Sequence, residues 1–419
     1  MIDKGDTAWV LISSALVLLM TPGLAFFYAG LVRQKNVLNT IMLSFIAIAL
    51  LGLVWILWGY SLAFGPDFMG WGFIGNLKWL GLSGVSAVEA GPYSPTIPHQ
   101  AFMIFQAKFA IITPALITGA IVERVRFRTL VIFLVVWSTI VYAPIAHWMW
   151  STNGWLGLGG WGALDFAGGA VVHISSGVAA LAAALVFGKR LTSESERMEP
   201  HNIPFVVLGA ALLWFGWFGF NAGSALTSLG AATNAFVVTN TAACAAALAW
   251  IALHWQATGK ISVVGGASGA VVGLAAITPG AGFVGPMPSI LIGLVAGSLA
   301  FFAVRLKNRL RFDDSLDVWA VHGVGGTWGI LATGLFVGVG YLSISSLAQP
   351  GMDRGEQILR QLATIGVVWA WSFGLTAIIL FALKKTIGLR VPAHEEEQGL
   401  DLAQHGEMAY RQPVGTDAK

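Results

Sequence analysis

The chain has 419 residues, of which 56% are hydrophobic and only 10% are charged, and its mean hydropathy is +0.76. These values exclude an ordinary soluble domain and predict an integral membrane protein. The net charge is +3, and we attribute it to basic loops on one side of the membrane and not to nucleic-acid binding.

Apolar segments of about 20 residues, a length suited to a hydrocarbon layer roughly 30 Å thick, recur along the whole chain. They predict an all-α membrane protein with eleven transmembrane helices. The first apolar segment lacks the basic start of a signal peptide, so we count it as a helix. The predicted helices are 9–32, 39–64, 100–122, 128–150, 165–187, 203–224, 233–255, 262–280, 287–306, 318–340 and 358–383.

Lysine and arginine residues gather in alternate loops, and cytoplasmic loops are the ones that retain an excess of positive charge. The basic loops lie at 33–35, 124–128, 189–197, 260, 305–311 and 384–390. With an odd number of helices, this pattern predicts an N-terminus outside the cell and a cytoplasmic C-terminus. We therefore expect a multi-pass protein of the cell (plasma) membrane, with a membrane domain, 1–383, and a cytoplasmic tail, 384–419.

Two patterns recur five helices apart, which indicates an internal repeat. Phe27-Tyr28-Ala29-Gly30 resembles Phe220-Asn221-Ala222-Gly223, and the spacing Asp165…His173 returns as Asp314…His322. An odd number of helices per repeat inverts its direction, as in many transporters whose working site lies near the middle of the membrane. We predict a five-plus-five inverted repeat, about 9–187 and 203–340, followed by the helix 358–383.

His173 and His322 are ionisable residues inside apolar stretches, and such residues usually mark a functional pathway. Each follows an aspartate by eight residues, so a rise of about 1.5 Å per residue places it roughly 12 Å deep, from opposite faces. The aspartate lies about 80° around the helix axis, so we expect each histidine to pair with the other. Two alternatives stay open, a pair that only fixes helix packing and bis-histidine ligation of a haem.

Three aromatic segments converge on the predicted outer side, and aromatic faces attract cations. They are Phe105–Phe109, Trp148–Trp150 and Trp217–Ser224. The hydroxyl of Ser224 could accept a hydrogen bond from an N–H donor, so this mouth would suit a small ammonium-like cation. The alternative is an ordinary belt of interfacial tryptophans.

Several segments closely resemble the signature sequences of the ammonium transporter (Amt/Mep/Rh) family, in its Amt-type branch. They are Asp165-Phe166-Ala167-Gly168-Gly169-Ala170-Val171-Val172-His173, Trp217-Phe218-Gly219-Phe220-Asn221-Ala222-Gly223-Ser224 and Val321-His322-Gly323-Val324-Gly325-Gly326. The resemblance covers essentially the whole chain. It implies eleven helices in each subunit, a homotrimer and one pore through every subunit.

The resemblance also implies roles for individual residues. Trp150 and Ser224 resemble the outer ammonium site, with Phe109 beside it and Asp165 supporting it electrostatically without touching substrate. Phe109 and Phe220 resemble a stacked gate, and Trp217 resembles a pore-wall indole. His173 and His322 resemble the twin-histidine pair of the lumen.

Lys108 departs from the family pattern, because it places a cation next to the presumed gate. It lies about 100° around the helix from Phe109. It could therefore face a neighbouring helix, a subunit contact or the membrane surface, or it could face the pore and repel ammonium.

The expected function is ammonium transport, in which ammonium is captured outside, deprotonated, and conducted as ammonia through a hydrophobic pore while the histidines assist proton relay. Neutral ammonia crosses an apolar constriction more cheaply than a desolvated cation. We expect no enzyme, cofactor or metal, since no nucleophile-plus-base or Cys/His metal spacing is visible. The alternative is an ammonium sensor or receptor with little transport, although the short tail carries no recognisable catalytic signalling domain.

The tail 384–419 is polar, and by itself it reads as a solvated extension. The family resemblance implies instead a regulatory tail that packs on the cytoplasmic face, couples subunits and helps a PII-type signalling protein to dock.

Overall fold

The computed structural model describes residues 1–191, 198–340 and 353–410. The only strands among these residues are β1 (Ala90–Gly91) and β2 (Ser94–Pro98), a short antiparallel pair. The rest of the regular structure is helical, and nine helices of the described chain are long and apolar enough to cross a membrane. This confirms the predicted class of an all-α membrane protein.

The nine helices follow the predicted order. They are α1 (Lys4–Leu31), the composite helix Gln34–Phe64 that contains α2 (Val37–Val54) and α3 (Tyr60–Phe64), α4 (His99–Ile117) with its extension to Ala120, Phe127–Trp150 made of α5 (Phe127–Trp137) and α6 (Ala143–Trp150), Gly169–Phe187 ending in α7 (Ser175–Phe187), α8 (Ile203–Gly223), α9 (Gly230–Thr258), α11 (Pro286–Leu310) and α13 (Arg354–Thr386).

Two further apolar segments occupy the positions of the eighth and tenth predicted helices. α10 (Val263–Ile277) is shorter than the predicted 262–280, and the tenth segment is Trp319–Phe336, which ends in α12 (Gly325–Phe336). The fifth predicted helix begins at Gly169, four residues later than expected. The difference arises because Asp165 caps this helix and does not belong to it.

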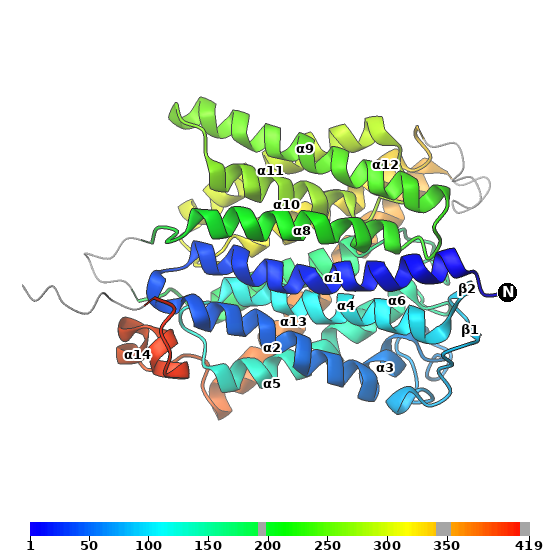
Figure 1. Cartoon of the computed structure of the whole chain (residues 1–419), viewed down its shortest axis with the longest axis horizontal. Coiled ribbons are helices and arrows are strands. Elements are labelled where there is room, and N and C mark those ends of the chain that lie inside the picture. Colours follow the sequence, from blue (N-terminus) through cyan, green and yellow to red (C-terminus); the bar gives the residue numbers. More distant parts are fainter. Residues whose placement is uncertain (192–197, 341–352, 411–419) are drawn as a thin grey trace, which may run out of the picture.

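The helices lie side by side along one common direction (Figure 1). The N-terminus and the β1–β2 pair lie at one end of the bundle, and α14 (Ala393–Gln398) lies at the opposite end. α1 packs along α8 at backbone distance, because a Cβ at Gly209 would lie only 2.3 Å from the Phe27 nitrogen. Small residues allow such close approach between membrane helices.

The polar tail folds back onto the loops at its end of the bundle. After α14, the π-helical turn η9 (Asp401–His405) lies against α2, where Asp401 accepts hydrogen bonds from the amides of Leu38 at 3.0 Å and Asn39 at 2.8 Å. Glu396, Gly399, Leu400 and Asp401 are buried, so this part of the tail is docked and not merely solvated. Residues 411–419 of the predicted tail, and 192–197 of the third basic loop, lie outside the described residues.

Candidate functional site

Asp165 begins the site by capping the helix that carries His173. Its two carboxylate oxygens accept hydrogen bonds from four consecutive amides, those of Gly168 at 2.8 Å, Gly169 at 2.6 Å, Ala170 at 2.8 Å and Val171 at 3.1 Å. Gly168 has φ of +120°, a conformation that residues with a Cβ rarely adopt. The carboxylate satisfies the helix's unpaired N–H groups and fixes where the helix begins.

Asp314 caps the helix that carries His322 in the same way. Its carboxylate accepts hydrogen bonds from the amides of Val318 at 3.2 Å and Trp319 at 2.8 Å. Burial raises the pKa of Asp314 to about 6, although the nearby Lys307 acts in the opposite direction. The repeated Asp…His spacing therefore has a structural basis, since each aspartate sets the start of a helix and each histidine lies at a fixed depth within it.

Both histidines lie on π-helical turns, which the sequence did not reveal. The turns are η6 (Gly169–Ile174) and η7 (Trp319–Val324), directly before α7 and α12. A π-turn widens the helix by one residue and is frequent at functional sites.

The two helices cross at a point of backbone contact. A Cβ at Gly177 would lie 2.0 Å from the Gly323 nitrogen, so neither helix could approach the other if Gly177 carried a side chain. The contact brings Nδ1 of His322 to 3.2 Å from Nδ1 of His173, with the ring centroids 5.2 Å apart. Each histidine therefore has the other as a partner, and neither contacts its own aspartate.

The histidines line a narrow internal lumen with a volume of about 20 Å³. A cavity of this size has room for about one water-sized molecule. Apart from the histidines and the Tyr28 and Trp217 side chains, the lining is aliphatic or phenyl, including Leu24, Phe27, Val172, Leu213, Phe220 and Val321. His173 is stacked near Trp217, with centroids 5.4 Å apart.

Thr278 is the site residue that the sequence reasoning missed. Its hydroxyl donates to the Leu274 carbonyl at 2.8 Å and accepts from the Trp217 indole N–H at 2.9 Å. The same oxygen lies 3.4 Å from Nε2 of His173, on the side of the ring away from His322. The only sequence signal would have been a hydroxyl residue before Pro279 at the end of an apolar segment.

Phe109 and Phe220 close the lumen on the side of the aromatic mouth. Their ring centroids are 4.4 Å apart with an interplanar angle of 46°, and both side chains are buried. Phe109 also makes an edge contact with Trp150, at 5.8 Å between centroids. The structure thus places the two predicted gate residues against each other, between the mouth and the histidines.

Beyond the two phenyl rings lies an open vestibule of about 360 Å³. Trp150, Asp165 and Ser224 line it, together with Tyr93 and Phe283. The Trp150 indole N–H donates to the Asp165 carbonyl at 2.9 Å, and the Ser224 hydroxyl donates to the Phe220 carbonyl at 2.8 Å. Because the Ser224 proton is engaged, its free lone pairs can accept hydrogen bonds from an N–H donor that enters the vestibule.

Lys108 does not line the lumen. It lines a groove on the outside of the bundle with Leu18, Ile48, Ala49, Gly52, Leu53, Ile56, Ile104, Ala107 and Ile111. The cation therefore does not stand in the path between the vestibule and the histidines.

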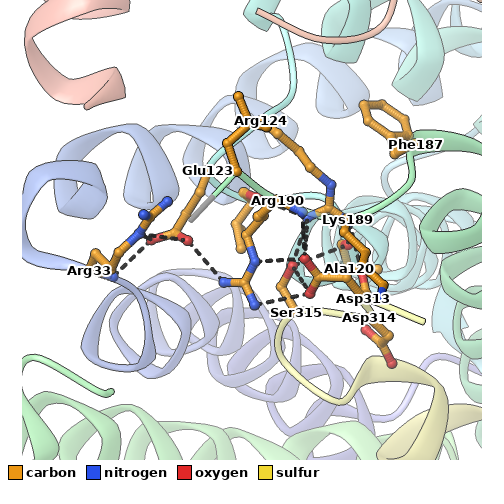
Figure 2. Close-up of polar contacts among 12 residues, drawn as sticks. Arg33, Ala120, Glu123, Arg124, Phe187, Lys189, Arg190, Asp313, Asp314 and Ser315 are labelled. Atoms are coloured by element: carbon orange, nitrogen blue, oxygen red, sulfur yellow. Dashed lines mark hydrogen bonds and ion pairs between the residues drawn. The ribbon is translucent and has the colours of Figure 1, made fainter. Parts of the chain in front are cut away.

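Four loops meet in an ionic network at the end of the bundle where the tail lies. Figure 2 shows Arg190 between Glu123 and Asp313, with Nη1 2.9 Å from Glu123 Oε2 and Nε 2.9 Å from Asp313 Oδ2. Arg33 also contacts Glu123 at 3.1 Å. Burial would raise the pKa of Glu123, but Arg190 and Arg33 outweigh it and hold that pKa below its usual value. The tail joins the network because Glu396 accepts from the Leu191 amide and contacts Arg390.

The geometry argues against a haem between the histidines. Metal–nitrogen bonds of about 2 Å on opposite sides of an ion would hold the two nitrogens about 4 Å apart, whereas His173 and His322 approach to 3.2 Å. Among the described residues, no group of three or more His, Cys, Asp or Glu side chains could hold a metal ion.

Comparisons with known proteins agree with this arrangement. The chain is similar to the ammonium transporter of Bacillus subtilis, with 48% identity over 98% of this chain and 99% of that protein. Its structure is similar to the crystal structure of Saccharomyces cerevisiae Mep2, with a TM-score of 0.85 and 37% identity over 94% of this chain and 90% of that one. It is also similar to a protein described as a sensor Amt protein, with a TM-score of 0.86 and 32% identity over 96% and 98% of the two chains.

Residues 8–410 match the model of the Ammonium Transporter Family. This match and the relative from Bacillus subtilis confirm the resemblance seen in the sequence. The chain is a multi-pass protein of the cell membrane and belongs to the Ammonium Transporter Family.

Proposed function

We propose that the chain transports ammonium by deprotonating it and conducting ammonia through the lumen, with the histidine pair assisting proton relay. The observation that carries the proposal is the contact of 3.2 Å between His173 and His322 inside a lumen of about 20 Å³. A linked pair of imidazoles can donate and accept protons together. The His173–His322 pair lies in a lumen so narrow and apolar that a cation there would lose its hydration shell, which favours passage of neutral ammonia.

The vestibule supports capture of the charged form. Ammonium would contact the face of the Trp150 indole. Lys108 would not repel it, because Lys108 lies on the outer surface of the bundle. The Ser224 oxygen would accept a hydrogen bond from an ammonium N–H. Asp165 would contribute a negative charge, although its carboxylate oxygens already accept hydrogen bonds from backbone amides. Phe109 and Phe220 would then admit only the neutral molecule, because the cation–π attraction of two phenyl rings replaces only a small part of the hydration that a cation would lose.

We propose the topology of eleven helices in a five-plus-five inverted repeat, with the N-terminus outside and the tail cytoplasmic. Two capping aspartates, two π-turns and two histidines that recur in corresponding order support the repeat. The position of α14 at the end opposite the N-terminus supports termini on opposite faces (Figure 1). The basic network beside α14 supports a cytoplasmic location for that face.

We also propose a homotrimer with one pore in each subunit and regulation through the tail. The family relationship motivates the trimer. The contacts of Asp401 with α2 and of Glu396 with Leu191 support the idea that the tail senses or sets the state of the cytoplasmic loops, where a PII-type protein would dock.

Uptake into liposomes tests transport against the alternative of an ammonium sensor, which the similarity to a sensor Amt protein keeps in view. The wild type should carry ammonium inward along its gradient, and His173→Ala should lose most of this uptake while binding at the vestibule persists. His254→Ala, near the C-terminal end of α9 and away from the lumen lining, is the matched control and should transport normally. Ammonium binding by the wild type without any uptake would favour the sensor and contradict the proposal.

A further inference from the structure

The groove that contains Lys108 is formed by the outer faces of α1, α2 and α4, away from the lumen. Its volume is about 290 Å³, and nine of its ten lining residues are apolar. On α4 the lining positions are Ile104, Ala107, Lys108 and Ile111, the spacing of one helical face. Leu53 on the rim is 63% exposed, as expected for a surface that faces lipid.

Lys108 brings a positive charge to this surface without a protein partner. Within residues 1–191, 198–340 and 353–410, its ammonium group makes no hydrogen bond or ion pair. A charge at membrane depth is costly unless it reaches the interface or meets a counter-charge. The groove therefore lacks an anionic partner for Lys108 within the described chain.

A second copy of the chain does not supply the missing counter-charge. In the described membrane helices the carboxylates are Asp6 and Glu356, and both lie in the first turn of their helices. Lys108 lies nine residues into α4, so no carboxylate of another copy's helices would stand at its depth. An anion from the membrane itself remains as the complementary partner.

The direction of the side chain fits a lipid headgroup. Cα–Cβ bonds in a helix tilt toward its N-terminus, and α4 begins at His99, at the end of the bundle that carries the aromatic mouth. The Lys108 ammonium group therefore leans toward the membrane surface on that side, where phosphates lie. Below it, the groove is hollow because Gly52 has no side chain, and a Cβ there would meet only one Ile111 atom, at 3.9 Å.

We propose that this groove is a binding site for one anionic phospholipid molecule per subunit, from the leaflet on the side of the mouth. Lys108 donates to the phosphate, and an acyl chain occupies the hollow beside Gly52. The site adjoins the gate, because Lys108 precedes Phe109 on α4, so a bound lipid holds the helix that carries one of the two gate rings against α1 and α2.

Two substitutions separate the charge from the hollow. Lys108→Met keeps most of the length of the unbranched side chain and removes the charge, whereas Gly52→Leu fills the hollow and leaves the charge. Native mass spectrometry of the full-length protein, titrated with phosphatidylglycerol or phosphatidylcholine, measures the lipid retained per subunit. Lys78→Met, in an exposed loop near the mouth, and Gly374→Leu, in an open groove on α13 that lacks a cation, are the matched controls.

The wild type should prefer phosphatidylglycerol, and Lys108→Met should weaken its binding by about ten-fold or more, the effect of one charged hydrogen bond. The same substitution should weaken phosphatidylcholine less, because the choline cation already neutralises the charge of that lipid's phosphate. Gly52→Leu should weaken both lipids, and both controls should match the wild type. Equal affinity of the wild type for the two lipids would overturn the proposal, as would unchanged phosphatidylglycerol binding by Lys108→Met. A loss of subunit association in both variants, with lipid binding unchanged, would assign the groove to a neighbouring copy instead.

Discussion

At the scale of single residues, Asp165 shows how one side chain can serve both architecture and the site. Its carboxylate accepts four backbone hydrogen bonds and also lines the vestibule. The sequence predicted an electrostatic role, and the capping role became visible only with the backbone in place. The two roles predict different consequences for different substitutions.

Asp165→Ala should destabilise the protein by about 2 kcal/mol or more, because it leaves four buried amides without acceptors. Asp165→Asn keeps one acceptor oxygen and should lose less stability, yet it removes the negative charge and should lose as much ammonium uptake. Thermal unfolding and uptake, measured on the same preparations, separate the two effects. Equal stability of Asp165→Ala and the wild type would contradict the cap.

Thr278 provides a second residue-scale prediction. Thr278→Val keeps the shape of the side chain but leaves the buried Trp217 N–H without its acceptor, which should cost about 1–3 kcal/mol. In the double variant with Trp217→Phe, no orphaned donor remains, so the two losses should combine to less than their sum. The measurement is a double-mutant cycle by thermal unfolding, and strictly additive losses would show that the hydrogen bond contributes nothing.

Some residues of the candidate site could be predicted from the sequence, and others could not, because their contacts depend on the fold. His173 and His322 were predictable because ionisable groups are rare in apolar segments. Phe109, Trp150 and Ser224 were predicted first as parts of aromatic segments and then through the family resemblance. Thr278 could not be found, since a hydroxyl in a helix normally satisfies itself on its own backbone. The orientation of Lys108 also needed the structure, because 100° around a helix is compatible with several neighbours.

At the scale of elements, helix existence was predictable and helix detail was not. Apolar length predicts a membrane span, but the π-turns η6 and η7 leave no mark in hydropathy because they change the backbone register without changing composition. The start of the fifth helix at Gly169 was not predictable either, because apolar length alone does not distinguish the first residue of a helix from the residue, here Asp165, that caps it. The close crossing of the helices at Gly177 and Gly323 became visible only with the backbone in place.

The ionic network of Arg190, Glu123 and Asp313 predicts how the stability of the protein depends on pH. Arg190→Gln should destabilise the protein by about 3–5 kcal/mol at pH 7, because Glu123 and Asp313 lose a buried partner. Arg190 and Arg124 hold the pKa of Asp313 well below its usual value despite burial, and the pKa of Glu123 is also lowered. Lowered pKa values mean that the stabilisation is present above the carboxyls' unfolded pKa values and disappears as the pH falls through the folded ones.

The difference in stability between wild type and Arg190→Gln should therefore stay constant from pH 8 to pH 5 and shrink below about pH 4.5. Thermal unfolding across this range measures it. Arg126→Gln is the control, because Arg126 is exposed and its side chain donates only to the Ile387 carbonyl among the described residues. A difference that grew on acidification would contradict the network as described.

The tail offers an element-scale test of regulation. Asp401→Ala removes the side chain that caps α2, a loss of about 1 kcal/mol or a factor of about 5 in the docked population of the tail. Limited proteolysis of the tail should accelerate by a similar factor, and ammonium uptake should change with it. Glu407→Ala removes the same charge from an exposed position and should change neither. Faster proteolysis with unchanged uptake would remove the regulatory role and leave only a docked tail.

At the scale of the whole molecule, the vestibule, the phenyl pair and the histidines lie in series. The ionic network of Glu123, Arg190 and Asp313 (Figure 2) lies among the loops at the end of the bundle where α14 lies (Figure 1). Under the proposed mechanism, selectivity would be a property of the path and not of a single residue. Potassium could enter the vestibule but has no proton to release, so it would not shed its hydration shell to pass the gate.

Ion selectivity in liposomes distinguishes transport by deprotonation from passage of an intact cation. Ammonium and potassium gradients of equal size are imposed in turn, and current and uptake are recorded with the wild-type protein. We expect uptake of ammonium and no potassium current above that of protein-free liposomes. Potassium carried at a rate comparable to ammonium would contradict this expectation, because a hydrated cation would then be crossing the lumen intact.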